Sequence, residues 1–239
     1  MKNNINWNFD NTYSKLPEPF REKINPVKVK NPKLILLNES LAKDLNLDFS
    51  EISQSELSAI FTGNELPKNS NSIAQAYAGH QFGHFTMLGD GRAVLIGEHV
   101  SKNNHRYDIQ FKGSGKTAFS RNGDGRAALG PMLREYLISE AMYALNIPTT
   151  RSLAVAKTGE NVIRETQLEG AILTRVASSH IRVGTFQYIA ARNKKGELET
   201  LFEYVVKRHY PEIENSKNKA LDLLKVVLDK QIEIGRAHV

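Results

Sequence analysis

The sequence predicts an α+β fold in which a β-rich first half is followed by a helical end. Between residues 92 and 176, apolar runs rich in β-branched residues are separated by polar turns, a pattern typical of antiparallel strands. One long stretch, 127–145, interrupts the strands with apolar residues at helical spacing, and that spacing returns beyond Gly184. We therefore expect a twisted antiparallel sheet with one long packed helix, followed by a group of helices.

The N-terminal region predicts an irregular arm and then short regular elements. Proline fixes φ and removes a hydrogen-bond donor, so later elements must hold the arm in place. Its prolines are Pro17, Pro19, Pro26 and Pro32. Residues 33–37 form a short apolar run, and Asn38 opens a helix that continues to about residue 45. Ser53 and Glu56 form a capping box, so a second helix should end at Gly63.

Turn residues divide the rest of the chain into a hairpin, a long helix, two strands and three helices. We expect strands at 92–100, 106–111, 152–156 and 171–176, with turns at 101–105 and 157–161. Pro131 suits the first turn of the helix at 127–145. The later helices are expected near 185–191, 198–209 and 217–234, separated by Gly196 and Pro211.

Length and composition allow one large domain or two small lobes. The chain has 239 residues, of which 40% are hydrophobic and 24% charged, values ordinary for a globular protein. We expect an arm with short helices at 1–68, a sheet-bearing lobe at 69–180 and a helical region at 181–239. The main boundary is expected between Val176 and Gly184, where strands give way to helices.

Charge and residue usage narrow the class of partner. The net charge of +6 favours an anionic partner, although a merely basic surface explains it equally well. The chain has no cysteine, which excludes disulfides, thiolate metal sites and a cysteine nucleophile within it. The start of the chain lacks the pattern of a secretory or transit signal, and no run of 18 apolar residues occurs. We expect a cytoplasmic protein without a membrane span.

A repeated tetrapeptide indicates a phosphate site. Gly-Asp-Gly-Arg occurs at residues 89–92 and again at 123–126, on either side of a predicted strand that ends at Lys112. Glycine permits a tight turn with accessible backbone N–H groups, and arginine presents a planar fork of donors that fits phosphate oxygens. The two copies and the lysine together predict a phosphate-binding constellation.

Lys112 needs a carboxylate partner if it is to contact phosphates, because its flexible stem must be held in place. Glu135 lies on the predicted long helix and can supply one, which is the logic of a kinase-type small lobe. Glu140 is the rival, but it points about 140° around the helix from Glu135. A solvated Lys112 and a surface Glu135 remain the simpler alternative.

Other candidate residues have a structural and a functional interpretation. Asp124 and Gly125 precede the long helix, so Asp124 is either its N-cap or a residue beside a ligand. Arg175 and Arg182 frame the expected lobe boundary, where two arginines suit a triphosphate, although surface salt bridges also explain isolated arginines.

Two metal or phosphate motifs are rejected. His80 and His84 have the i, i+4 spacing of metal ligands on a helix, but glycines at 79 and 83 argue against a helix and no third ligand is evident. Residues 113–117 lack the glycine spacing of a P-loop.

With these residues in view, the chain resembles the selenoprotein O family. The similarity runs from about residue 31 to residue 211 and is dense in four segments, 77–93, 110–127, 134–151 and 174–184. Their most distinctive motifs are Tyr77-Ala78-Gly79-His80-Gln81-Phe82-Gly83, Gln110-Phe111-Lys112-Gly113-Ser114-Gly115, Arg134-Glu135-Tyr136-Leu137 and Thr174-Arg175-Val176-Ala177-Ser178-Ser179-His180-Ile181-Arg182. Matches of this length and order are highly specific.

The resemblance implies a protein-kinase-like fold that binds ATP in a reversed pose. It implies transfer of AMP, rather than phosphate, to Ser, Thr or Tyr hydroxyls of acceptor proteins. It also implies that Glu135 pairs with Lys112. The implied nucleotide contacts are Gly89, Gly91, Arg92, Lys112, Asp124, Gly125, Arg175 and Arg182.

One departure from the family concerns the end of the chain. In the family the general base and the Mg²⁺ ligands come later, in the large lobe, and residues 235–239 do not resemble the family continuation. We therefore expect a truncated large lobe, and neither a catalytic base nor a metal ligand within this chain. The isolated chain should bind ATP weakly or not at all, and transfer nothing.

The alternative is a non-enzymatic module that binds a nucleotide or nucleic acid in the same basic cleft. Aromatic residues make up only 8% of the chain, a weak basis for a single-strand stacking platform. ATP and acceptor proteins are therefore the expected partners, and nucleic acid is not.

Overall fold

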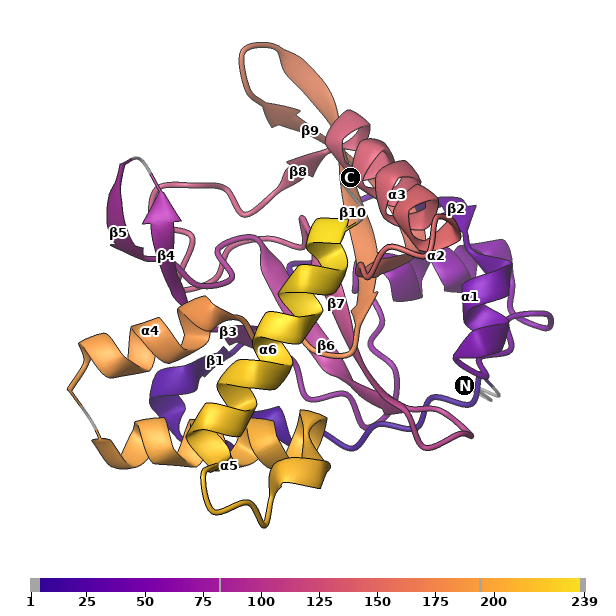
Figure 1. The fold of residues 1–239 in the computed structure, drawn as a ribbon. Helices are drawn as coiled ribbons and strands as arrows, with labels where there is room; N and C mark the ends of the chain where they lie inside the picture. Colours follow the sequence, from indigo (N-terminus) through magenta and orange to yellow (C-terminus); the bar gives the residue numbers. More distant parts are fainter. Residues whose placement is uncertain (1–4, 82, 194, 237–239) are drawn as a thin grey trace.

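The computed structural model describes residues 5–81, 83–193 and 195–236. Its main element is an eight-stranded sheet in the order β1-β3-β6-β7-β10-β9-β2, with β8 paired to β10 (Figure 1). All neighbouring strands in it are antiparallel. The strands are β1 Arg21–Lys23, β2 Lys33–Leu37, β3 Ile73–Gln75, β6 Ala93–Val100, β7 Arg106–Lys112, β8 Ala127–Ala128, β9 Arg151–Ile163 and β10 Gln167–Ala177. β4 Ala78–Gln81 and β5 His84–Met87 form a separate hairpin.

Six α-helices occur in the described part of the chain, and the predicted α+β class is confirmed. They are α1 Glu39–Asp44, α2 Gln54–Thr62, α3 Leu129–Ala144, α4 Val183–Ala191, α5 Lys195–His209 and α6 Lys219–Arg236. Short 3₁₀ turns lie at Tyr13–Lys15, Glu18–Phe20 and Pro211–Ile213. Within the described ranges, no helix has both the length and the apolar character needed to cross a membrane.

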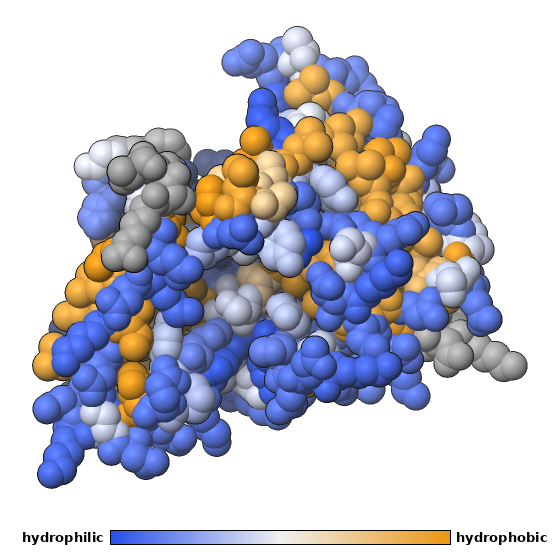
Figure 2. Space-filling model, turned by 45° about the vertical axis from the view of Figure 1, so that its right-hand side comes forward, coloured by the Kyte–Doolittle hydropathy of each residue, from blue (hydrophilic) through white to orange (hydrophobic). Residues whose placement is uncertain are grey.

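Strand alternation places helices on both faces of the sheet. On β10, Ile172 joins the core formed with α1 and α2, whereas Ala171 and Leu173 join the core under α3. Successive side chains of a strand point to opposite faces, so α1 and α2 cover one face and α3 the other. The outer side of α3 is solvent-exposed and apolar, and Figure 2 shows these hydrophobic side chains gathered beside the projecting β9–β10 hairpin.

The N-terminal arm is held in place as expected, by burial of its large side chains. Tyr13, Leu16 and Phe20 pack with residues of β3, β6, α4 and α5 in a third core. The arm therefore joins the helical end of the chain to the sheet.

The predicted capping box of α2 is confirmed. Ser53 Oγ accepts a hydrogen bond from Glu56 N at 3.3 Å, and Glu56 Oε2 accepts one from Ser53 N at 3.1 Å. Gly63 ends the helix at φ 77°, a left-handed conformation that glycine adopts without steric cost. The hairpin formed by β6 and β7 is confirmed as well.

Several element predictions are wrong. Residues 157–161, expected as a turn, continue β9, because Lys157 pairs with β2 and β10 and Asn161 pairs with β10. Gly159, at φ 70°, lies where the register between β9 and β10 shifts. Gly196 lies inside α5 rather than before it. The strands β1, β3, β4, β5 and β8 were not predicted, since each spans at most four residues, and β8 occupies the first two residues of the helix expected at 127–145. Phe82, in the first family motif, and residues 237–239, in the segment expected to depart from the family, lie outside the described residues.

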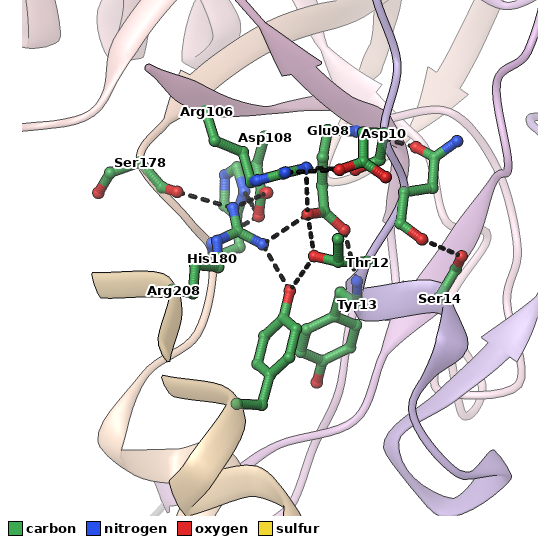
Figure 3. Close-up of polar contacts among 12 residues, drawn as sticks. Asp10, Thr12, Tyr13, Ser14, Glu98, Arg106, Asp108, Ser178, His180 and Arg208 are labelled. Atoms are coloured by element: carbon green, nitrogen blue, oxygen red, sulfur yellow. Dashed lines mark hydrogen bonds and ion pairs between the residues drawn. The ribbon is translucent and has the colours of Figure 1, made fainter. Parts of the chain in front are cut away.

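A buried ionic cluster attaches α5 to the sheet (Figure 3). Arg208 donates to Glu98 Oε2 at 3.0 Å and to Asp108 Oδ1 at 2.6 Å. Glu98 and Asp108 face each other on β6 and β7, and both side chains are 1% exposed, against 5% for Arg208. Tyr204 OH accepts from the same guanidinium at 2.9 Å. Arg208 is thus the cation shared by two carboxylates that the sheet has removed from water, while Arg106 Nη1 lies 3.4 Å from Glu98 Oε2.

We expect Arg208→Ala to lower the free energy of unfolding by about 3–5 kcal/mol, because it leaves two buried carboxylates without their main cation. Chemical denaturation followed by circular dichroism measures the change. Lys207→Ala, at the exposed neighbouring position, is the control and should stay within about 0.5 kcal/mol of the wild type. Equal effects of the two substitutions would contradict this role of Arg208.

We also expect stability to fall as the pH drops from about 6.5 towards 4. Burial lowers the pKa of the His209 imidazole to about 4, and the charge of Arg208 acts in the same direction. The unfolded chain takes up the proton near pH 6.5, before the folded state does, so acid favours unfolding. At pH 5 this loss is about 1 kcal/mol after allowance for partial exposure. Denaturation of His209→Gln at pH 7 and pH 5 should show a smaller difference than wild type; an unchanged difference would contradict it.

Candidate functional site

A small polar cavity of about 220 Å³ lies at the end of β7 where β6 begins. Its walls come from five separate stretches of the chain, which meet only in the folded state. The lining residues are Tyr77, Asp90, Gly91, Arg92, Ala93, Lys112, Arg175 and Arg182. A larger open groove of about 1400 Å³ runs between the N-terminal arm and α5–α6, and its walls mix apolar side chains with basic ones. The smaller cavity contains Lys112 together with Gly91, Arg92, Arg175 and Arg182 of the predicted set, and is the candidate site.

The register of the sheet explains why these cations meet. On β7, Asp108, Gln110 and Lys112 alternate with buried apolar residues and point to the same face of the sheet. Lys112 lies opposite Ala93 on β6, next to Arg92, while Gln110 lies opposite Arg175 on β10. Directly paired residues of antiparallel strands lie on the same face, so Arg175 shares a face with Gln110 and therefore with Lys112. Lys112 and Arg175 are diagonal neighbours on that face and approach each other.

Lys112, Glu135 and Arg175 form an ion network across the sheet and α3. Lys112 Nζ contacts Glu135 Oε2, and Arg175 Nη1 lies 3.6 Å from Glu135 Oε1. Burial lowers the pKa of the Lys112 ammonium, while its hydrogen bond to Glu135 opposes that shift. Glu140, the rival partner, instead binds Arg151 at 2.7 Å and accepts from Ser152 N at 2.9 Å.

Arg182 forms the wall of the cavity nearest α4. Its guanidinium carbon lies 4.0 Å from the ring centroid of Tyr77, a cation–π contact, and its Nε donates to His180 O at 3.2 Å. His180 N in turn donates to Asp108 Oδ2 at 2.8 Å. The wall of the cavity is therefore connected to the ionic cluster of Arg208.

Asp90 is the one acidic residue among the described residues that line the cavity. It is 4% exposed and accepts hydrogen bonds from Gln110 Nε2 at 3.0 Å and Gln75 N at 3.2 Å. Burial raises the pKa of its carboxyl, while the charges of Arg182, His180 and Arg175 lower it.

The structure brings Gly91, Arg92, Lys112, Arg175 and Arg182 together around the cavity. Gly89, Asp124 and Gly125 do not line it. A Cβ at Gly89 would lie 2.3 Å from the Phe119 ring. A Cβ at Gly91 would lie 2.6 Å from Phe119 O. Both glycines let the loop after β7 pack against the first Gly-Asp-Gly-Arg turn.

The second Gly-Asp-Gly-Arg copy has structural contacts of its own. Asp124 binds Arg164 at 2.7 and 3.0 Å and accepts from Arg126 N at 2.8 Å. The hydrogen bond from Arg164 lowers the pKa of this carboxyl. Its interpretation as the N-cap of the long helix is wrong, because Ala128 occupies that position. Gly125 adopts φ 68°, and a Cβ there would lie 2.1 Å from the backbone of Gly115.

Sequence reasoning missed Tyr77, Ala93 and the roles of Asp90 and Gln110. Asp90 lies inside the first Gly-Asp-Gly-Arg tetrapeptide, so the motif already included it. Gln110 lies two residues before Lys112 on the same strand, so strand alternation could have placed Gln110 on the face of Lys112. Tyr77 precedes a strand too short to predict, and no sequence signal placed it near Arg182.

The lining residues fit an anion better than a metal ion. No group of three His, Cys, Asp or Glu side chains suited to a metal occurs within residues 5–81, 83–193 and 195–236. His80 lies on β4 and His84 on β5, so they are not on one helix. The Asp90 carboxylate is already engaged by two donors, whereas Mg²⁺ requires several free oxygen ligands.

Comparisons with known proteins define the class of this chain. It is 67% identical over 230 residues to a protein nucleotidyltransferase YdiU of Pelagibacter ubique (strain HTCC1062), covering 96% of this chain and 48% of the relative. Identity to the protein of the same name from Nitrosococcus oceani is 61%, covering 96% and 47% of the two chains. Identity to the protein of the same name from Shouchella clausii (strain KSM-K16) is 58%, covering 98% of this chain and 48% of the relative. All three relatives are named as protein nucleotidyltransferases.

The family model described as protein adenylyltransferase SelO matches residues 3–236. The chain belongs to this SelO family, as its sequence motifs predicted. The matched range is wider than the expected 31–211, and it includes Gly235 and Arg236, which were expected to depart from the family. The chain spans about half the length of the curated relatives it matches.

We expect Glu135→Gln to lower the pKa of Lys112 further, because the carboxylate that favours the charged amine is lost while Arg175 remains nearby. More of the amine is then neutral near pH 8, so an amine-specific acylating reagent should modify Lys112 faster, as measured by peptide mass spectrometry. Glu140→Gln is the matched control, since Glu140 binds Arg151. Equal modification rates in both variants would contradict the network.

Proposed function

We propose that this chain is the ATP-binding part of a protein adenylyltransferase that transfers AMP to Ser, Thr or Tyr hydroxyls of acceptor proteins. The observation that carries the proposal is the convergence of Arg92, Lys112, Arg175 and Arg182 on one cavity. Four cations against one buried carboxylate attract a polyanion, and arginine forks fit phosphate oxygens bidentately. Family membership supports the reaction type.

The size and polarity of the cavity support a pose in which phosphates enter it and the base remains outside. Ligand pockets commonly enclose about 300–1,000 Å³ and are mostly apolar. This cavity of about 220 Å³ is smaller, and its walls are dominated by charged side chains. Such a site suits the terminal phosphates of ATP better than adenine. This agrees with the reversed pose that the family resemblance implies.

In this pose the chain's residues stabilise the leaving group. The acceptor hydroxyl gives its proton to a general base that is not assigned to this chain, and its oxygen attacks the α-phosphorus. The bond from that phosphorus to the bridging oxygen breaks, and pyrophosphate departs with the negative charge. Lys112, Arg175 and Arg182 would hold that charge, which grows in the transition state. Glu135 keeps Lys112 directed into the cavity. Gly89, Asp124 and Gly125, which lie away from this cavity, would act only by supporting nearby loops or through a more extended nucleotide contact.

Magnesium, which accompanies ATP in such reactions, neutralises phosphate charge. The cavity residues do not fit magnesium, so we derive no step through the ion. No general base is assigned here either. We propose that magnesium binding and general-base catalysis both belong to the part of the family sequence that these 239 residues do not match. We further propose a kinase-like small lobe at 69–180, preceded by an arm at 1–68 and followed by the first helices of a large lobe at 181–239.

We expect the chain to bind ATP weakly and Lys112→Ala to bind at least tenfold more weakly, because a charged hydrogen-bonding partner of the phosphates is lost. NMR titration with ATP measures both affinities. Lys116→Ala is the matched control, since this exposed lysine does not line the cavity and carries the same charge. Equal affinities of wild type and Lys112→Ala would contradict the proposed site.

Two further measurements on the same preparation separate the alternatives. With labelled ATP and a generic protein acceptor, the chain should transfer no AMP, and robust labelling would contradict the assignment of the base to another part of the family sequence. Single-stranded oligonucleotides should bind no better than ATP. Much tighter oligonucleotide binding, unaffected by magnesium, would favour the non-enzymatic nucleic-acid module.

A further inference from the structure

We infer that Gln110 is a positioning residue, which works with Asp90 to hold the Arg175 guanidinium in the orientation that grips phosphate. This inference rests on the proposed function, because it assigns a role in the same cavity. Gln110 is 0% exposed and does not line the cavity, so it acts through Arg175 rather than on a ligand.

The contacts of Gln110 require an amide. Arg175 Nη2 donates to Gln110 Oε1, and Gln110 Nε2 donates to Asp90 Oδ2 at 3.0 Å. A guanidinium can only donate and a carboxylate can only accept, so the residue between them must present an acceptor on one side and a donor on the other. The planar amide of glutamine meets both demands, and its neighbours leave it one orientation.

Asp90 is a fixed anchor for this amide. Its backbone N donates to Gln75 O at 2.9 Å, and its carboxylate accepts from Gln75 N at 3.2 Å, so β3 holds both its main chain and its side chain. Thr117 Oγ1 donates to Asp90 O at 2.7 Å. The position of the carboxylate is therefore set by the strand and by the loop after β7.

Arg175 has few other restraints. Its Nη1 lies 3.6 Å from Glu135 Oε1, and its Nε is buried without a hydrogen-bond partner among the described residues. Glu135 is shared with Lys112. Without Gln110, the guanidinium would be free to turn fully towards Glu135 and compete with Lys112 for the carboxylate. The amide thus keeps both cations directed into the cavity.

A double-mutant cycle on ATP affinity tests the inference. Gln110→Met preserves the length of the side chain but removes the amide, and we expect ATP affinity to fall about tenfold. Arg175→Met should reduce affinity by a similar or larger factor. In the Arg175→Met background, adding Gln110→Met should lower ATP affinity by less than a further factor of two, because the arginine through which Gln110 acts is already absent.

Thr174→Val is the matched control. Thr174 lies on the neighbouring strand with the same 0% exposure, but on the opposite face, and its hydroxyl has no partner among the described residues. We expect its ATP affinity to equal that of wild type. Multiplicative effects of Gln110→Met and Arg175→Met, or a Gln110→Met affinity equal to wild type, would overturn the positioning role.

Gln110→Asn keeps the test decisive if Gln110→Met does not fold. It retains a polar amide but is one methylene too short to reach both Arg175 and Asp90, and we expect a loss of ATP affinity between threefold and tenfold that likewise disappears in the Arg175→Met background. A loss that persists there would overturn the inference. The Lys112→Ala variant separates the two proposals. If Lys112→Ala and wild type bind ATP equally, the proposed function fails. If Lys112→Ala binds more weakly but the two Gln110 variants bind like wild type, the positioning role alone fails.

Discussion

The ionic link between the helical end and the sheet centres on one side chain, Arg208, which reaches from α5 to two buried carboxylates. Glu98 and Asp108 face each other on β6 and β7, and neither could remain ionised there without a partner. Asp108 also accepts from His180 N, and His180 O accepts from Arg182 Nε. The same carboxylate therefore fixes α5 and one wall of the candidate site, so stability and ligand geometry have a common origin.

A single strand face supplies three kinds of residue to this arrangement. Asp108 joins the ionic cluster, Gln110 contacts Arg175, and Lys112 enters the cavity. Because the period of a strand is two residues, a register shift by one position would bury these groups under α1 and α2 and turn the apolar residues towards the cavity and the ionic cluster. The apolar side chains between them thereby secure the placement of the polar face.

How much of the structure the sequence predicts depends on whether each element is determined by local sequence or by contacts with distant parts of the chain. The capping box at Ser53, the long helix with Glu135 and the β6–β7 hairpin follow from local patterns, and they were predictable. The continuation of β9 through 157–161 was not, because polar residues and Gly159 form strand there only through pairing with β2 and β10. Family motifs indicated the cations of the site, but the contacts of Gln110 and the structural bonds of Asp124 depend on strand pairing and on the distant Arg164.

The contact between Gly89 and Phe119 has a consequence for how such sequences can vary. The ring occupies the space that any Cβ at residue 89 would need, and the positive φ of 96° already disfavours other residues there. A larger residue at 89 would be tolerated only if the aromatic ring were exchanged for something smaller and the turn relaxed at the same time. Amino-acid changes at positions 89 and 119 should therefore be correlated. The cause would be steric contact between the two loops and not a catalytic requirement.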